Sequence, residues 1–281
     1  MKHPVRSLSH SPKRKKVLFL IGPTAVGKSE VAVELAKKIG AEIISCDSMQ
    51  VYKGMDILSS MPSKDLTHTV KHHLINIVNP SKEYDVYQYY KSALRKVKEI
   101  IKKRRIPLFV GGSGLYINIL LNGIFKLKGS SKRIRDLLYL EAKNKGLHYL
   151  YERLKKIDPQ VSSKIHPHDL RRIVRALEVY EISRIPISQL HKQRKGLFNL
   201  YEIKIFGLWM QKNLLYERIK DRLENMFNKG LIQEVKRLLG KNLSKTASSA
   251  IGIQEIKGYL EGKYDLDTAK SLIEKRTRLL V

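Results

Sequence analysis

Residues 17–40 read VLFLIGPTAVGKSEVAVELAKKIG, and this stretch decides the fold. Residues 17–21 form a short apolar run that stops at a Gly-Pro pair, which predicts a buried strand. A helix should follow, because apolar side chains recur at helical spacing until Gly40. Between strand and helix, residues 22–29 fit G-x-x-x-x-G-K-[ST], the pattern of a phosphate-binding loop.

Each part of the loop at 22–29 suits an oligophosphate. Gly22 and Gly27 let the backbone bend so that amide groups converge on phosphate oxygens, and the N-terminus of the next helix adds a favourable field. Lys28 supplies a point charge, and the Ser29 hydroxyl can ligate Mg²⁺. The candidate diphosphate-binding residues are Gly22, Pro23, Thr24, Ala25, Val26, Gly27, Lys28 and Ser29. The pattern leaves open whether the ligand is a nucleoside triphosphate or another diphosphate.

The rest of the chain alternates strands and helices before its texture changes. Strand-like runs are expected at 42–45, 107–110 and 203–209, and a long amphipathic helix at 86–103. This alternation predicts an α/β fold, a P-loop NTPase-like parallel sheet flanked by helices. Residues 126–200 form a charged, helix-like segment with 18 basic and 7 acidic side chains, which predicts an insertion domain. The predicted division is a flexible basic tail at 1–16, a core at 17–125 and 201–281, and the helical insertion at 126–200.

Charge and cysteine content narrow the class of protein. The 281 residues include 55 Lys and Arg against 26 Asp and Glu, a formal charge of +29 that favours a polyanionic partner such as nucleic acid. The single cysteine, Cys46, excludes an intrachain disulfide and a metal site made of paired cysteines. The longest early apolar run, residues 17–21, is too short for a signal peptide or a membrane span. We therefore expect a cytoplasmic protein without a membrane segment.

Asp47 follows the second predicted strand. Ligands of open α/β sheets lie beyond the carboxyl ends of the strands, so we expect Asp47 beside the phosphate loop. A carboxylate there could accept a proton from a nucleophile or hold Mg²⁺ through water, and it could equally be a turn or N-cap aspartate. The run at 107–110 ends in Gly111 rather than in a carboxylate, which argues against an ATPase with a magnesium-binding Asp there.

Several motifs in order along the chain resemble the tRNA dimethylallyltransferase family, also called tRNA isopentenyltransferases. The likeness covers nearly everything from residue 17 to the end. It is carried by GPTAVGKS at 22–29, DSMQVYKGMDI at 47–57, HHLINIVNP at 72–80, IPLFVGGSGLYINILLNG at 106–123, HPHDLRRIVRALEVYEISRIPIS at 166–188, RIKDRLENMFNKGLIQEV at 218–235 and AIGIQEIKGYLEG at 250–262.

The resemblance implies transfer of a dimethylallyl group from dimethylallyl diphosphate to the exocyclic amine of the adenine at position 37, beside the tRNA anticodon. It implies that Asp47 is the general base and that Lys28, with the loop amides, stabilises the departing pyrophosphate. It further implies that Ser29 binds a Mg²⁺ cofactor, and that Ser113 and Arg222 act catalytically at the diphosphate. The implied partners are the anticodon loop of tRNA and dimethylallyl diphosphate, with the protein acting as a monomer.

The resemblance also implies a set of tRNA contacts. The candidates are Asp47, Ser48, Met49, Gln50, Ser113, Arg135, Arg171, Arg172 and Arg175. Asp169 can cap a helix that runs to about Glu181, with apolar residues on one face and the last three of these arginines on the opposite one. Such an arginine face suits phosphate contacts, although the same pattern is also typical of a solvated surface.

Some features depart from the family pattern. SSMP at 59–62 stands where the family often has Thr-Ala-Lys-Pro, so a lysine is missing, and Asn76 and Asn79 stand where Asp is common. The family usually continues past Val281 with a basic helix, so we expect tRNA affinity to differ more than the chemistry does. Two other hypotheses stay open at this point, a phosphate-loop small-molecule kinase and an RNA-binding protein that keeps the loop without catalysis.

Overall fold

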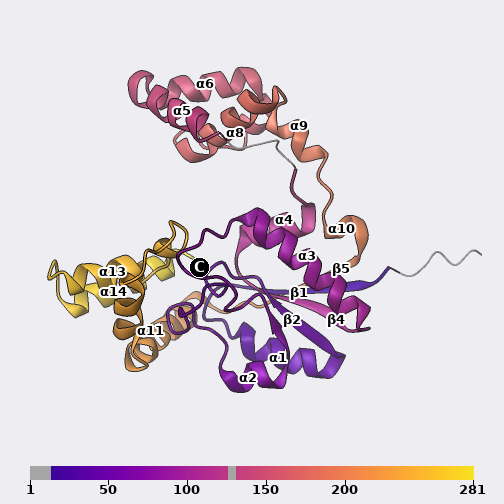
Figure 1. Ribbon diagram of the computed structural model, residues 1–281, viewed down its shortest axis with the longest axis vertical. Coiled ribbons are helices and arrows are strands. Elements are labelled where there is room, and N and C mark those ends of the chain that lie inside the picture. Colours follow the sequence, from indigo (N-terminus) through magenta and orange to yellow (C-terminus); the bar gives the residue numbers. More distant parts are fainter. Residues whose placement is uncertain (1–13, 126–130) are drawn as a thin grey trace, which may run out of the picture. The chain divides into compact units, whose positions relative to one another are not determined.

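The computed structural model describes residues 14–125 and 131–281 (Figure 1). Two compact units make up the chain. They are Met1–Leu121 with Leu197–Val281, and Asn122–Gly196. The phosphate loop and the candidate active site both belong to the first unit.

Two of the predicted segments, the tail and the insertion, can be compared with the structure. Most of the tail predicted at 1–16 lies outside the described residues, and Lys16 already belongs to the first strand. The second unit overlaps the insertion predicted at 126–200, of which residues 126–130 also lie outside the described part. Nowhere in the described ranges does a helix have the length and apolar character needed to cross a membrane.

A five-stranded sheet in the order β3-β2-β4-β1-β5 forms the centre of the first unit. All neighbouring strands are parallel, which confirms the predicted α/β fold with a parallel sheet. The strands are β1 (Lys16–Ile21), β2 (Ala41–Ser45), β3 (His72–His73), β4 (Ile106–Gly111) and β5 (Glu202–Gly207). β5 lies at the sheet edge, so Ile205 and Phe206 stay exposed despite the apolar run that predicted the strand.

Successive residues of β1 face opposite layers of the first unit, as the twofold period of a strand requires. Val17 and Phe19 join the buried cluster that contains the apolar face of α3 (Val86–Lys102). Leu18 packs instead with α1 (Lys28–Ile39). Two more helices cover the sheet, α2 (Lys64–Thr69) and α4 (Gly114–Asn122). Figure 1 shows α1 and α2 on one face of the sheet and α3 and α4 on the other.

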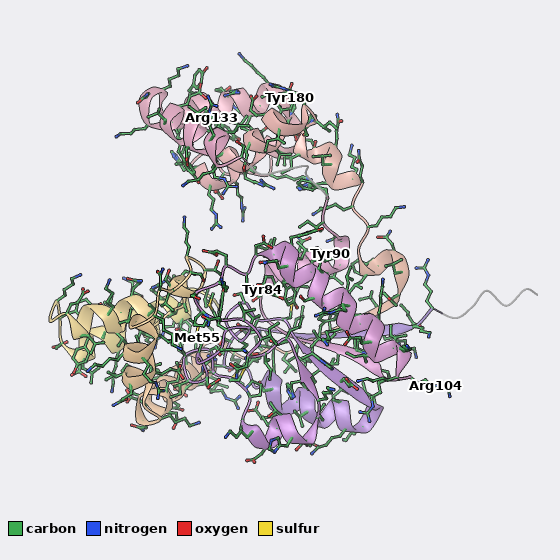
Figure 2. All side chains as sticks on the ribbon, viewed as in Figure 1. Met55, Tyr84, Tyr90, Arg104, Arg133 and Tyr180 are labelled. Carbon is green, nitrogen blue, oxygen red and sulfur yellow. The ribbon has the colours of Figure 1, made fainter. Side chains whose placement is uncertain are left out.

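The helices on either side of β5 in the sequence extend the first unit beyond the sheet. They are α10 (Leu197–Leu200), which precedes β5, and α11 (Lys212–Asn228), α12 (Leu231–Leu239), the short η1 (Ala247–Ser249), α13 (Ile253–Leu260) and α14 (Leu266–Arg278), which follow it. Figure 1 shows α11, α13 and α14 gathered together. Leu223 and Ile273 from these helices share one buried cluster with Met55 and Tyr84, both labelled in Figure 2. This cluster fixes the C-terminal helices against the loops that follow the strands.

The second unit is a helical bundle with a core of its own. Its helices are α5 (Lys132–Lys145), α6 (Leu147–Ile157), α7 (Pro159–Ser162), α8 (Leu170–Ser183) and α9 (Ile187–Lys192). Ile173 and Leu177 of α8 are fully buried among apolar side chains of α5 and α6. As predicted, Asp169 caps α8, accepting a 3.0 Å hydrogen bond from the backbone N–H of Arg172.

Candidate active site

The phosphate loop connects β1 to α1 and has the backbone conformation that its glycines predict. Gly27 precedes α1 in the left-handed region, at φ 90° and ψ 25°, which favours glycine. At Gly22 a Cβ atom would lie 2.7 Å from the carbonyl oxygen of Leu208, so a side chain has no room there. The loop therefore needs both glycines, one for its conformation and one for the close approach of the chain after β5.

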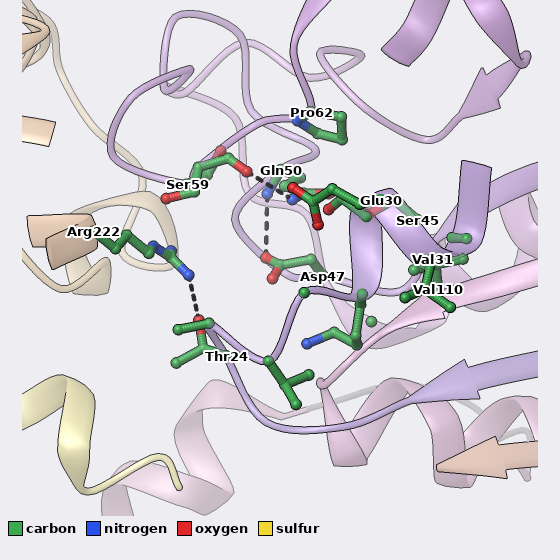
Figure 3. Close-up of a pocket in the computed structure, with 18 of the residues that line it drawn as sticks. Thr24, Glu30, Val31, Ser45, Asp47, Gln50, Ser59, Pro62, Val110 and Arg222 are labelled. Carbon is green, nitrogen blue, oxygen red and sulfur yellow. Dashed lines mark hydrogen bonds between the residues drawn. The ribbon is translucent and has the colours of Figure 1, made fainter. Parts of the chain in front are cut away.

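Lys28 and Arg222 both donate hydrogen bonds to this loop. Lys28 Nζ donates a 2.6 Å hydrogen bond back to the carbonyl of Pro23, and Arg222 Nη1 from α11 donates a 2.5 Å hydrogen bond to Thr24 Oγ1 (Figure 3). Burial lowers the pKa of Lys28 from its usual value, and the nearby Asp47 carboxylate partly opposes that shift. Burial likewise lowers the pKa of Arg222, again opposed by Asp47. Two desolvated cations close to one carboxylate form a site suited to a polyanion.

Asp47 lies in a turn and at the same time borders the phosphate loop. Its Oδ1 accepts hydrogen bonds from the backbone N–H groups of Met49 at 2.8 Å and Gln50 at 3.3 Å. Oδ2 accepts no hydrogen bond from any residue in the described part of the chain. The turn and the functional interpretations of Asp47 are therefore compatible, because one oxygen holds the turn and the other remains available to a ligand.

Ser113 and Gln50 are both tied to neighbouring parts of the site. Ser113 Oγ accepts from the N–H of Ser48 at 3.2 Å, which joins the loop after β4 to the turn of Asp47. Gln50 Oε1 accepts from Ser45 Oγ at 2.8 Å, and Gln50 Nε2 donates to the carbonyl of Ser60 at 3.4 Å. Both ends of the Gln50 amide thus have partners inside the protein, so it shapes the site; its contact with a base stays a prediction.

Two cavities in the first unit meet at this point. One has a volume of about 780 Å³ and is lined by residues 24–32 of the loop and α1, with Arg218, Asp221 and Arg222 of α11. The other has a volume of about 600 Å³ and contains Ser113. Its apolar lining comes mainly from Met49, Leu58, Ile219, Leu223, Met226, Ile251, Ile273, Leu279 and Leu280. Both cavities are bordered by the same five residues, which we name the cavity junction: Thr24, Lys28, Asp47, Ser59 and Arg222.

The end of β4 has no acidic residue for a physical reason. At Gly111 a Cβ atom would lie 2.2 Å from the carbonyl oxygen of Cys46, because β4 and the end of β2 approach closely there. Cys46 N–H also donates a 2.7 Å hydrogen bond to the carbonyl of Val110. The geometry therefore excludes any side chain at this position, including the magnesium-binding Asp of many ATPases.

The arginines predicted to contact tRNA differ in their surroundings. Arg171 and Arg172 are exposed on α8, and Arg172 Nε lies 3.3 Å from Asp169 Oδ2. Arg135 of α5 and Arg175 of α8 both bind the carboxylate of Glu178, whose side chain is fully buried. Arg135 thereby holds α5 against α8, a role that the helical pattern alone did not predict, while Arg175 pairs with Glu178 within α8. All four keep exposed surface, and their contact with RNA stays a prediction.

Sequence reasoning also missed parts of the site. Ser59 borders both cavities, and Arg218 and Asp221 line the larger one. Glu234 of α12 binds the backbone of the loop that carries Ser59. Arg218 and Asp221 could have been linked to Arg222 by their spacing, since the three recur at three and four residues on one helix face. Ser59 has no such signal, because a loop serine follows no period.

Comparison with known proteins gives consistent results. A family model described as IPP transferase matches residues 50–281. The chain is 46% identical over 266 residues to a tRNA dimethylallyltransferase of Carboxydothermus hydrogenoformans, covering 94% of this chain and 86% of the relative. It is 42% identical over 266 residues to a protein of the same name from Thermotoga maritima, with the same coverage of 94% and 86%.

Solved structures agree with the sequence relatives. A full-length tRNA isopentenylpyrophosphate transferase from Bacillus halodurans is 34% identical with a TM-score of 0.68, over 95% of this chain and 84% of that one. A eukaryotic dimethylallyltransferase acting on tRNA is 28% identical with a TM-score of 0.80, over 95% of this chain and 68% of that one. The similarity therefore extends over both units and includes the phosphate loop.

Proposed function

The chain belongs to the tRNA dimethylallyltransferase family, and on that premise we propose that it transfers a dimethylallyl group from dimethylallyl diphosphate to tRNA. The acceptor is the exocyclic amine of the adenine directly 3′ of the anticodon, and the products are N6-isopentenyladenosine and pyrophosphate. The observation that carries the proposal is the cavity junction, where one carboxylate and two cations border both cavities.

The larger cavity suits the diphosphate. Loop amides and the N-terminus of α1 provide donors, and Lys28 and Arg222 provide charge at the junction. These cations bond to the neutral oxygens of Pro23 and Thr24, so a diphosphate would offer them charged acceptors instead. The smaller cavity, with its apolar lining, suits the prenyl chain and the flat face of a purine.

The proposed reaction divides its charge changes between these groups. The adenine nitrogen forms a bond to the prenyl C1 atom while the bond from C1 to the diphosphate oxygen breaks, and the electron pair leaves with pyrophosphate. Lys28 and Arg222 face the negative charge that builds on the leaving oxygens, where fixed donors lower the barrier. Asp47 takes the proton that the amine loses, through the oxygen that does not hold the turn.

The residues present also fit a magnesium ion as a cofactor. Mg²⁺ in phosphate sites commonly binds through one or two protein ligands together with substrate phosphates and water. Ser29 and Asp47 line the same cavity as the loop amides, and they supply oxygen ligands of the required kind. When bound, the ion would neutralise phosphate charge; Ser29 would hold it directly.

Recognition of tRNA is proposed from charge and from exposed arginines. The net charge of +29 attracts the phosphate backbone, and Arg171 and Arg172 offer donors on the surface of α8. The target base must leave its stack to enter the site, which is easiest from a single-stranded loop. The proposal places the protein in the cytoplasm with its tRNA substrates. It requires a single copy of the chain, since the residues of the junction come from one unit.

Pyrophosphate release tests the proposal. The protein should release pyrophosphate only when dimethylallyl diphosphate, Mg²⁺ and unmodified tRNA are all present, and Lys28→Met should abolish most of the release. Adding ATP with small nucleoside or shikimate-type acceptors serves as the control for kinase activity. ATP consumption without tRNA-dependent pyrophosphate release would reject the prenyl transfer and favour a small-molecule kinase.

A further inference from the structure

Ser59 has an unusual environment for a loop serine. It is only 8% exposed, and its hydroxyl forms no hydrogen bond with any residue in the described ranges of the chain. Ser59 nevertheless belongs to the cavity junction, so the residue lines both cavities, and Figure 3 shows it in the lining of the larger one. Buried polar groups are almost always paired, because an unpaired one costs about 1–3 kcal/mol. A ligand at the junction is therefore the natural partner of this hydroxyl.

The backbone around Ser59 is held firmly in place. Glu234 of α12, itself 3% exposed, accepts hydrogen bonds from the N–H groups of Ile57 at 3.0 Å and Leu58 at 2.8 Å. The N–H of Ser59 donates to the carbonyl of Met55 at 3.0 Å. Ser59 thus lies at the junction because its backbone and the two residues before it are anchored, and not because its side chain has a partner there.

The charge of the neighbours indicates which ligand the hydroxyl meets. Lys28 and Arg222, which share the junction with Ser59, are cations that suit an anion. A diphosphate offers only acceptor oxygens, and a serine hydroxyl can always donate. The next loop residue, Ser60, lines the larger cavity with the phosphate loop and is absent from the lining of the smaller one. These observations favour the diphosphate over the adenine as the partner of Ser59.

We infer that Ser59 is a substrate-binding residue, whose hydroxyl donates a hydrogen bond to a diphosphate oxygen of the prenyl donor beside the bond that breaks. Glu234 is the positioning residue that sets the loop for this contact. The inference rests on the proposed function and adds a specific donor to it. Because the hydroxyl remains unpaired until the ligand binds, its contribution appears in ligand affinity and is absent from folding stability.

Binding of inorganic pyrophosphate, followed by calorimetry on the full chain, tests this contact without turnover. Ser59→Ala should weaken pyrophosphate binding about tenfold or more, since a hydrogen bond to a charged group is lost. Ser59→Thr keeps the hydroxyl and should stay within about threefold of the wild type. Ser248→Ala removes a hydroxyl of η1 that donates to the carbonyl of Lys245 and lines neither cavity, so it serves as the control and should leave pyrophosphate binding unchanged.

Thermal stability and catalysis complete the test. Ser59→Ala should melt at or above the wild-type temperature, because no protein hydrogen bond is broken, while kcat/KM for dimethylallyl diphosphate falls with the pyrophosphate affinity. Glu234→Gln should also weaken pyrophosphate binding. The loss of affinity caused by Ser59→Ala should be smaller in the Glu234→Gln background than in the wild type, since the effects of coupled residues are not additive.

The outcomes separate this inference from the proposed function. An active wild type whose Ser59→Ala variant binds pyrophosphate within about twofold of normal would overturn the inference and leave the prenyl transfer intact. A drop in melting temperature that accounts for the lost affinity would also overturn it, as would weaker tRNA binding with unchanged pyrophosphate binding. A wild type that binds pyrophosphate through Ser59 and makes no prenylated tRNA would instead refute the proposed function.

Discussion

Asp47→Asn is the substitution that separates the chemistry of Asp47 from its structural part. The asparagine amide oxygen can still accept from the N–H groups of Met49 and Gln50, so the turn is kept. The variant loses the carboxylate that takes the proton, and a positioned general base is typically worth about 10²–10⁴ in rate. We expect kcat to fall by that order while tRNA affinity changes little, because the net charge of the protein becomes more positive by only one unit.

Single-turnover kinetics with enzyme in excess and labelled dimethylallyl diphosphate would measure this step directly. Asp47→Ala is the comparison variant, since it also removes the two turn hydrogen bonds, whose loss costs about 0.5–2 kcal/mol by analogy with helix caps. The alanine variant should therefore be less stable than the asparagine variant and equally slow. If Asp47→Asn keeps a rate within about fivefold of the wild type, Asp47 is not the base.

Three further predictions concern other parts of the molecule. Burial lowers the pKa of Lys28, so pyrophosphate affinity should fall as the pH rises through that lowered value. Lys28→Arg should not show this loss. Pyrophosphate ionises equally in both titrations, so the difference between the two proteins reports Lys28 alone. Gly111→Ala should cost at least about 1–3 kcal/mol in urea unfolding, because its Cβ would meet Cys46, whereas Gly114→Ala meets nothing within 4 Å and should be tolerated. Arg171→Ala should reduce the slope of log affinity for tRNA against log salt by about 1, and an unchanged slope would remove Arg171 from the phosphate contacts.

Local sequence was sufficient for the centre of the fold. The strand, loop and helix around 17–40 were predicted because a buried run, a loop motif and helical spacing lie within 24 consecutive residues. Asp47 could be placed near the loop because parallel strands end at a common edge, and Asp47 follows one of these ends. The short β3 gave no pattern, since two residues are too few to show a period.

Long-range contacts could not be predicted in this way. Arg222 reaches Thr24 across 198 residues of sequence, so its place at the loop followed only from the family resemblance. The pairing of Arg135 with buried Glu178 depends on how α5 packs on α8, which the periodicity of either helix does not determine, whereas Arg175 reaches Glu178 from three residues away on the same helix. A carboxylate on the buried face of α8 converts two predicted RNA contacts into residues that also stabilise the bundle.

The central claim is that the phosphate loop and Asp47 act on a prenyl diphosphate and a tRNA adenine in one site. Mass analysis of nucleosides from an unmodified tRNA, incubated with the protein, dimethylallyl diphosphate and Mg²⁺, tests it most directly. The reaction should yield one modified nucleoside, an adenosine that carries a single added C5H8 group, from the position 3′ of the anticodon. Unmodified adenosine alone, from a folded protein that binds both tRNA and the diphosphate, would contradict it.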